Sequence, residues 1–217
     1  PSYPSPFYGL MLSFAQHNAK PLMKYDINQI NHLIRNRRSV FPKMYTGEPV
    51  PREIIEAMLE NANWAPTHKF TEPWRFTVFY QDQIEQFARF QSDLYRQRTE
   101  DSGTFNQDTF EKLRQKPLMA SCIIALGMKR DPERRIPELE EIAAVSCAVQ
   151  NMYLTATAYG IGCYWSTGGP TFWEEAKPFF SLEPDDKLLG FLYIGMPVEK
   201  AYRSTRGSWQ EKVEWKE

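Results

Sequence analysis

The chain has 217 residues, of which 42% are hydrophobic and 24% are charged, so its composition excludes an intrinsically disordered chain. Its 26 Lys and Arg residues nearly balance 27 Asp and Glu residues. This balance argues against a nucleic-acid-binding protein held by neutralisation of many phosphates. At roughly 150 residues per domain, the length suits one large domain or two small ones.

The N-terminal segment, residues 1–25, contains four prolines and is predicted to form an arm outside the core, followed by a single domain over residues 26–217. The period of the apolar residues and the Pro and Gly breaks predict the elements of that domain. In chain order these are a helix over 27–34, a helix within 48–66, a loop over 67–73, a strand over 75–80, an interrupted helical stretch over 82–116, a strand over 118–128, a charged loop over 129–138, a helix over 138–162, a short strand and Gly-rich turn over 163–170, a helix over 171–179 and a strand over 188–197.

Strands that alternate with long helices indicate an α/β or an α+β protein. The stretch 138–162 is the longest and least polar helical pattern, so it is expected to be the central buried helix, with Gly160 as its C-terminal stop. The acidic residues at 138–141 are interpreted as a helix start that the helix dipole favours. No strand is followed by GxGxxG and no P-loop occurs, so neither a Rossmann site nor a nucleoside triphosphatase is supported.

The three cysteines, Cys122, Cys147 and Cys163, are odd in number and show no CxxC spacing. This pattern argues against a disulfide scaffold and against a cysteine zinc site. Each lies in an apolar stretch and is expected to be a small buried side chain. We therefore expect a reducing compartment and a cytoplasmic protein. No apolar run approaches the roughly 18 residues of a membrane span, so no membrane partner is expected.

Hydrolytic and metal-dependent chemistry find no support in the sequence. The three histidines lie far apart, and none has a partner at metal-ligand spacing. No GxSxG motif occurs, and no cysteine stands in a recognisable nucleophile context. We therefore expect no metal site and no hydrolase.

Three segments could bind a ligand. Arg37, Arg38 and Ser39 directly follow the first helix, and two guanidinium groups with a hydroxyl would suit a phosphate, although cations also suit a solvated helix end. The loop within 65–76 is held between two prolines, and by itself it is merely a connection. Residues 160–169 form a strand end that opens into a Gly-rich turn, whose backbone could approach a flat ligand closely.

Taken together, in this order and spacing, these segments resemble those of the nitroreductase family of flavin oxidoreductases. The likeness runs from about Ile27 to Trp215. It includes a helix ending in RRS, a helix ending in AP, the segment PW-x-F, the helix QNMYLTATAYGIG, the strand FLYIGMP and a basic tail that closes on a Trp. The small, minimal members are the most similar, because in them a loop of the form APxHKxxxPW precedes the second strand.

The resemblance implies an α+β fold in which a mixed sheet is wrapped by helices, with a long central buried helix, in an intertwined homodimer. It implies FMN shared between the chains, reduced by NAD(P)H and reoxidised by a small-molecule acceptor such as a nitro compound or a quinone, in ping-pong order. Because the flavin carries the redox chemistry, no catalytic side chain is expected.

The resemblance also implies a set of cofactor-binding residues. An Arg-x-Ser motif and a C-terminal Arg would bind the phosphate, a loop after the second helix would touch the flavin ring from the partner subunit, and the Gly-rich turn would lie beside the ring. Residue by residue, the set is Arg37, Arg38, Ser39, Pro66, Thr67, His68, Glu72, Trp165, Ser166, Thr167, Gly168 and Arg206, with Arg203 as the alternative to Arg206.

Some positions depart from the family pattern or leave alternatives open. Many relatives have Gln where this chain has Glu72, and a carboxylate can only accept hydrogen bonds, so Glu72 either contacts the flavin or pairs with Lys69 or Arg75. Some relatives carry a Lys two residues beyond the motif Ser. Phe41 stands there in this chain, which leaves the positive charge beside the flavin unassigned. Trp165 either contacts the flavin or belongs to the core.

Two other functions remain open. A flavoprotein of the same fold could carry out reductive dehalogenation or flavin cleavage, and a long lid insertion would favour it, for which 82–116 is the candidate segment. Alternatively, the basic cluster at 35–39 docks an anion or a protein in a module without enzymatic activity. A colourless protein that takes up no FMN would favour that module.

Overall fold

The structure is a computed structural model, and it describes three stretches of the chain: residues 25–100, 102–198 and 204–217. The chain divides between His32 and Leu33 into two units, and the arrangement below is that of the second unit, residues 33–217. The predicted arm at 1–25 lies outside the described residues except for Tyr25, so the arm and the domain boundary stay predictions. Among the described helices, none is both long enough and apolar enough to cross a membrane.

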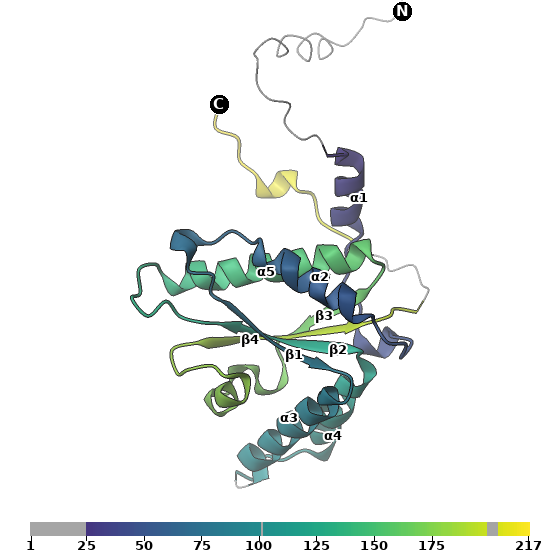
Figure 1. Ribbon diagram of the computed structural model, residues 1–217, viewed down its shortest axis with the longest axis vertical. Helices are drawn as coiled ribbons and strands as arrows, with labels where there is room; N and C mark the ends of the chain where they lie inside the picture. Colours follow the sequence, from purple (N-terminus) through teal and green to yellow (C-terminus); the bar gives the residue numbers. More distant parts are fainter. Residues whose placement is uncertain (1–24, 101, 199–203) are drawn as a thin grey trace, which may run out of the picture. The chain divides into compact units, whose positions relative to one another are not determined.

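A four-stranded sheet forms the centre of the second unit (Figure 1). Its strands are β1 (Trp74–Tyr80), β2 (Cys122–Met128), β3 (Gly162–Ser166) and β4 (Lys187–Gly195), in the spatial order β1-β2-β4-β3. Each strand pair is antiparallel, and an isolated bridge between Ser39 and Cys163 adds a parallel contact at the β3 edge. Every residue of β2 is buried, which explains its continuous apolar sequence. Helices packed on an antiparallel sheet confirm the predicted α+β class.

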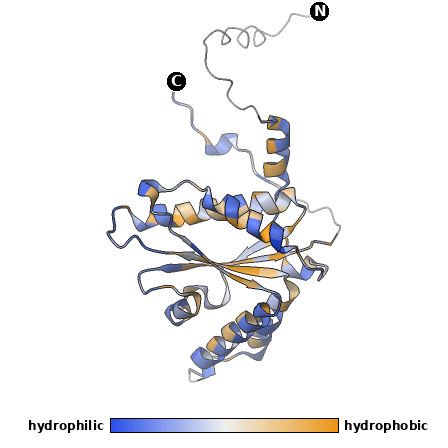
Figure 2. Cartoon of the chain, viewed as in Figure 1, coloured by the Kyte–Doolittle hydropathy of each residue, from blue (hydrophilic) through white to orange (hydrophobic). Residues whose placement is uncertain are grey.

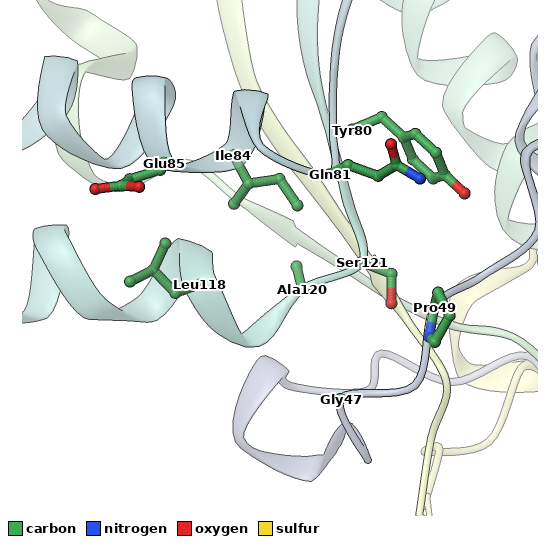
Figure 3. Close-up of a pocket in the computed structure, with 9 residues that line it drawn as sticks. All are labelled: Gly47, Pro49, Tyr80, Gln81, Ile84, Glu85, Leu118, Ala120 and Ser121. Carbon is green, nitrogen blue, oxygen red and sulfur yellow. The ribbon is translucent and has the colours of Figure 1, made fainter.

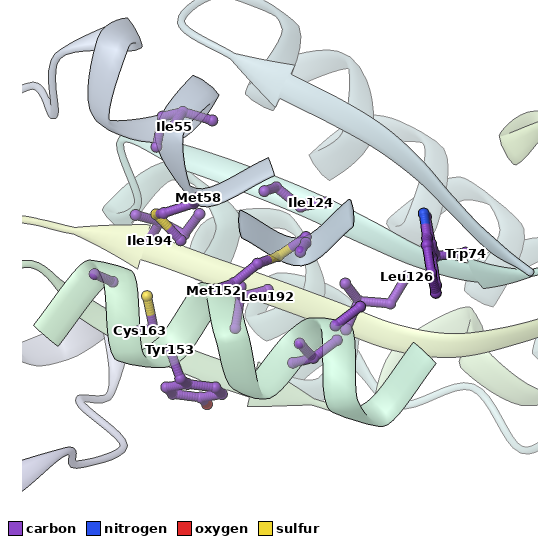
Figure 4. Close-up of a cluster of buried hydrophobic side chains, with 14 of the residues drawn as sticks. Ile55, Met58, Trp74, Ile124, Leu126, Met152, Tyr153, Cys163, Leu192 and Ile194 are labelled. Atoms are coloured by element: carbon purple, nitrogen blue, oxygen red, sulfur yellow. The ribbon is translucent and has the colours of Figure 1, made fainter. Parts of the chain in front are cut away.

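Helices cover both faces of this sheet. They are α2 (Arg52–Asn63) and α5 (Glu138–Ala158) on one face, and α3 (Gln83–Glu100) and α4 (Gln107–Gln115) on the other (Figure 1). Apolar residues concentrate where the helices meet the strands (Figure 2). The core under α2 and α5 contains Met58, Met152 and Leu192 (Figure 4), and the core under α3 contains Phe87 and Phe191. Two separate cores hold the sheet rigidly between the helix layers.

Several predicted boundaries agree with the structure and others shift. The strand predicted over 118–128 begins only at Cys122, because Lys116–Met119 forms a 3₁₀ turn instead. The helix predicted over 138–162 ends at Ala158, and Gly160 follows it with a φ of 73°, as expected of a C-terminal stop. The interrupted helical stretch is indeed two helices, α3 and α4.

Two predictions about burial and helix type are wrong in part. The segment predicted as a helix over 171–179 consists of two 3₁₀ segments, and Pro178 inside the second lacks the N–H that an α-helix requires. Cys122 and Cys163 are buried as expected, but Cys147 is only half-buried, although it packs against the core under α2 and α5. All three thiols are free, and burial raises the pKa of Cys122 to about 12.

Ion pairs fasten the charged loop over 129–138 to the start of α5. Arg130 pairs with Glu141, whose side chain is fully buried, and the Asp131 N–H donates to the same carboxylate at 2.8 Å. Hydrogen bonds from Arg135 lower the pKa of Asp131 to about 2. The dipole interpretation of the acidic run therefore misses the main role of Glu141, which compensates the charge of Arg130 inside the protein.

Candidate functional site

A cavity of about 430 Å³ brings the predicted phosphate-binding arginines together. It is lined by Ile34, Arg35, Arg37, Arg38, Gln150, Ser204 and Arg206. None of these lining residues is acidic, and four carry guanidinium groups. Arg206 thus joins Arg37 and Arg38, although it lies near the other end of the sequence, while its alternative Arg203 lies outside the described residues. The donor set of this cavity suits a phosphate, because each guanidinium offers forked N–H groups that match phosphate oxygens.

Tyr153 of α5 connects this cavity to the Gly-rich turn. The guanidinium carbon of Arg37 lies 5.0 Å from the centroid of the Tyr153 ring, within the range of a cation–π contact. The Tyr153 hydroxyl accepts the Trp165 backbone N–H at 2.7 Å and is hydrogen-bonded to Ser39. Burial raises the pKa of Tyr153, so the hydroxyl stays protonated. Val40 completes the connection, because its N–H donates to the Cys163 carbonyl at 2.8 Å.

Sequence reasoning did not identify Tyr153, although it lies within the helix segment that carries the family resemblance. Its signal was a tyrosine on the buried face of an apolar helix, and a buried tyrosine requires a partner for its hydroxyl. The partners, Ser39 and Trp165, come from segments far apart in sequence. Only the fold shows that one side chain joins two of the predicted segments.

The turn after β3 combines a buried part with an open part. The Trp165 indole N–H donates to the Leu189 carbonyl at 2.9 Å and the ring packs against the core, which favours the core interpretation of this residue. Thr167 and Gly168 are exposed. A Cβ added at Gly168 would meet only the Ser166 hydroxyl, 3.8 Å away. The backbone here is therefore accessible to a flat ligand.

Lys116 places an ammonium group beside this turn. Its Nζ donates to the Ser166 hydroxyl at 3.2 Å and lies 4.9 Å from the Tyr164 ring centroid and 4.8 Å from that of Tyr193. Burial lowers the pKa of Lys116, and no carboxylate of the described residues pairs with it. Sequence reasoning missed this residue because it stands in a polar stretch interpreted as helix. Lys116 is a candidate for the positive charge that Phe41 does not supply.

The predicted flavin loop, Pro66 to Glu72, is held by contacts within the loop and by contacts with the segment before and at the start of α5. The Thr67 hydroxyl accepts the Glu72 N–H at 3.1 Å, and Lys69, Phe70 and Glu72 all adopt positive φ angles. His68 lies 2.6 Å from a Glu140 carboxylate oxygen at the start of α5. Such a strained loop persists only where its surroundings hold it, and strain of this kind is common at functional sites.

Glu72 forms neither of the predicted alternative pairs. Lys69 donates to the Arg135 carbonyl at 3.2 Å, and Arg75 donates to the Glu72 backbone carbonyl at 2.9 Å. Among the described residues no side-chain partner is found for the Glu72 carboxylate. Glu72 is exposed, and so is Phe70 of the same loop, at 88%.

The loop and the arginine cavity lie at opposite ends of α5. His68 contacts Glu140 in the first turn, whereas Tyr153 contacts Arg37 and Trp165 near the last turns. Thirteen positions separate Glu140 from Tyr153, which at 1.5 Å per residue is roughly 20 Å. One chain therefore unites Arg37, Arg38, Ser39, Arg206 and the turn, but it does not bring the loop to them.

A second cavity, of about 220 Å³, contains none of the predicted site residues (Figure 3). Both of its hydroxyl groups are already hydrogen-bonded: the Tyr80 hydroxyl donates to the Val50 carbonyl, and the Ser121 hydroxyl donates to the Glu48 carbonyl. Glu85 is paired with arginines, whose hydrogen bonds and charge lower its pKa. We assign no function to this cavity.

The sequence model of the nitroreductase family matches residues 34–196. The chain belongs to this family. The Escherichia coli (strain K12) protein named "Putative NAD(P)H nitroreductase YdjA" is 32% identical over 173 residues, which make up 79% of this chain and 90% of that protein. A nitroreductase-like family protein from Bacillus cereus superposes with a TM-score of 0.73 and 26% identity, over 90% of this chain and 99% of that chain.

A solved structure from Desulfovibrio desulfuricans, in complex with FMN, superposes with a TM-score of 0.63 and 25% identity, over 89% of this chain and 99% of that chain. The predicted family and fold are therefore confirmed. The roles of the individual site residues stay predictions.

Proposed function

We propose that this protein is an FMN-dependent oxidoreductase that takes electrons from NAD(P)H and passes them to a small-molecule acceptor, such as a nitro compound or a quinone. The observation that carries the proposal is the cavity lined by four arginines, which Tyr153 joins to the open Gly168 turn. The name of the Escherichia coli relative supports NAD(P)H, and the FMN complex of the Desulfovibrio desulfuricans protein supports the cofactor.

The residues present fit FMN. Its phosphate carries roughly two negative charges, and the cavity offers guanidinium groups with no acidic residue in its lining. Its flat ring needs backbone without intervening side chains, and Gly168 provides an approach that a Cβ would fill. When bound, FMN supplies the redox chemistry by accepting a hydride and releasing electrons to the acceptor.

The side chains of this protein bind and orient the cofactor and place positive charge beside it. Arg37, Arg38 and Arg206 hold the phosphate, and the contact with the Tyr153 ring fixes the Arg37 guanidinium in place. Lys116 places a positive charge beside the turn, where it would favour the reduced form of a flavin bound there. None of these roles needs a general acid or base. We expect the two substrates to react in ping-pong order, because one reduces the flavin and the other reoxidises it.

We further propose a homodimer in which each FMN is shared between chains. All ten residues of α1 (Ile27–Asn36) are at least partly exposed, although Ile27, Ile30 and Ile34 form an apolar stripe. Residues 204–217 are exposed throughout, including Trp209 and Trp215. Apolar surface of this extent favours a partner. A second chain would also supply the flavin loop that lies roughly 20 Å from the cavity along α5.

Light scattering checks the dimer. An obligate interface of this type buries more than about 2,000 Å², so the protein should remain dimeric at micromolar concentration. A monomer that still holds FMN at that concentration would contradict the shared site.

Specific observations distinguish the two alternative functions from the proposed one. A lid that serves dehalogenation or flavin cleavage would be an insertion free of the core, but the candidate segment contains Phe87, which is fully buried under the sheet. A non-enzymatic docking module would use the same arginine cavity without a flavin. The cytoplasmic location stays a prediction that rests on the cysteine usage.

The visible spectrum of the purified protein tests the proposed function. We expect flavin bands near ~450 nm that bleach when NADH or NADPH is added under anaerobic conditions and return on addition of an acceptor. A protein that is colourless and takes up no FMN during dialysis against excess cofactor would refute the proposal and favour the docking module. Bands that do not bleach would favour the same fold with a different chemistry.

A further inference from the structure

Two neighbouring tyrosine rings lie against the Lys116 ammonium group. Tyr164 of β3 and Tyr193 of β4 are partners in the antiparallel register, and their ring centroids lie 6.4 Å apart. Because partners in a register point to the same face of the sheet, both rings face α3 and α4. The Lys116 Nζ lies less than 5 Å from each centroid, at 4.9 and 4.8 Å. A cation that lies close to two ring faces is attracted by both.

Gln91 holds one of the two rings, that of Tyr193. It lies on α3, its side chain is 2% exposed, and it is surrounded by the second apolar core. Its amide nitrogen donates to the Leu113 carbonyl of α4, and its side chain is hydrogen-bonded to the Tyr193 hydroxyl. A buried amide costs free energy unless its hydrogen bonds are made, so these two bonds fix both Gln91 and the ring of Tyr193.

Phe41 packs against the other ring, that of Tyr164. Its ring centroid lies 4.6 Å from that of Tyr164, and it occupies the position where some relatives carry a Lys. The ammonium beside these rings points at the turn, because Lys116 donates to the Ser166 hydroxyl at 3.2 Å. Gln91 also reaches the turn itself, since its Oε1 lies 3.1 Å from the place where a Cβ of Gly169 would be.

We propose that Gln91 and Tyr193 are positioning residues that hold the Lys116 ammonium against the Ser166–Gly169 turn, where its charge favours the electron-rich, reduced form of the bound cofactor. This inference rests on the proposed function. Burial without a carboxylate partner disfavours the charged form of Lys116 and so lowers its pKa. The two rings favour the charged form and offset part of this effect. Gln91 fixes the position of the Lys116 ammonium group; it does not determine whether that group is charged.

The test measures the midpoint potential of FMN bound to the full-length protein. A fixed positive charge favours the reduced form, so Lys116→Met should lower the equilibrium constant for reduction about tenfold, which is about 30 mV for a two-electron couple. Gln91→Leu should shift it in the same direction by about threefold. Lys112→Met and Gln97→Leu remove the same groups from exposed positions of α4 and α3 and should leave the potential unchanged.

A double variant separates positioning from general packing. In the Lys116→Met background, Gln91→Leu should have no further effect on the potential, because the charge that it positions is gone. Should Gln91→Leu fail to fold, Tyr193→Phe tests the same link, since it keeps the ring and removes only the hydroxyl. A potential unchanged by Gln91→Leu or Tyr193→Phe, or a shift that persists in the Lys116→Met background, would overturn the inference.

The failure of the inference and the failure of the proposed function give different results. If the wild-type protein binds FMN and the potential responds to Lys116→Met but not to Gln91→Leu, only the positioning role is wrong. If Lys116→Met has no effect either, the charge at the turn has no redox role, and the proposed function survives. A wild-type protein that takes up no FMN overturns both.

Discussion

Replacing Arg37 by Ala should weaken FMN binding by about 1.5–3 kcal/mol, the range of a charge-assisted hydrogen bond. The structure limits the loss to this range, because Arg35, Arg38 and Arg206 still line the cavity after the substitution. The corresponding rise in the dissociation constant is roughly 10- to 150-fold. Titration of the apoprotein with FMN, followed by flavin fluorescence, measures it directly.

Two controls separate loss of the phosphate contact from other effects. Arg52→Ala removes an exposed guanidinium on α2, paired with Glu56, and should leave the dissociation constant unchanged. Riboflavin lacks the phosphate, so its affinity for the Arg37→Ala variant should match its affinity for the wild type. An unchanged FMN dissociation constant in Arg37→Ala, or an equal loss of riboflavin affinity, would refute the assignment of this cavity to the phosphate.

Three further outcomes follow from the geometry. Gly168→Val should keep the thermal stability, because the added Cβ meets only a serine hydroxyl at 3.8 Å. It should slow flavin reduction by NAD(P)H at least tenfold, which is about 1.4 kcal/mol of barrier. Unaltered stopped-flow kinetics at full FMN occupancy would mean that the turn is only a structural connection. Glu141→Gln should lower the free energy of unfolding in urea by about 3–5 kcal/mol, because Arg130 would keep an uncompensated buried charge, and a loss below about 1 kcal/mol would contradict this. The pKa of Asp131 falls from 3.8 to about 2 on folding, so its contribution to the free energy of unfolding should be complete above about pH 4 and vanish as the pH falls toward 2. If the difference in free energy of unfolding between the wild type and Asp131→Asn does not change over this interval, the expectation is wrong.

Local patterns were sufficient for most of the fold. The apolar period placed α2 and α5, and Gly160 marked the end of α5, because one face of a helix must meet the core in any arrangement. The error over 171–179 has a local cause that the pattern obscured. Pro178 removes a backbone donor, so the chain there forms 3₁₀ segments although its apolar spacing suits an α-helix.

The site was predictable only where its residues adjoin in sequence. Arg37, Arg38 and Ser39 formed a visible motif, but their connection to β3 through Tyr153 depends on how α5 crosses the sheet. Lys116 was missed for the same reason, since it lies in a 3₁₀ turn and its neighbours Tyr164 and Tyr193 come from β3 and β4. Long-range pairing of this kind leaves no periodic signal in a single sequence.

The separation of the flavin loop from the cavity makes the shared site testable by mixing chains. A dimer is formed from one chain with Arg37→Ala and one with His68→Ala, isolated by two different tags. If each FMN lies between one chain's cavity and its partner's loop, one site carries both substitutions and the other carries neither. Such dimers should bind one FMN with wild-type affinity per two chains. If each chain bound FMN with its own loop, every site would carry one substitution and none would bind with wild-type affinity. If the loop took no part in binding, the dimer with His68→Ala in both chains would keep wild-type affinity at both sites, whereas the shared arrangement predicts that this dimer loses affinity at both. His68 and Arg37 contact opposite ends of α5, roughly 20 Å apart, so the shared arrangement is the one that the geometry favours.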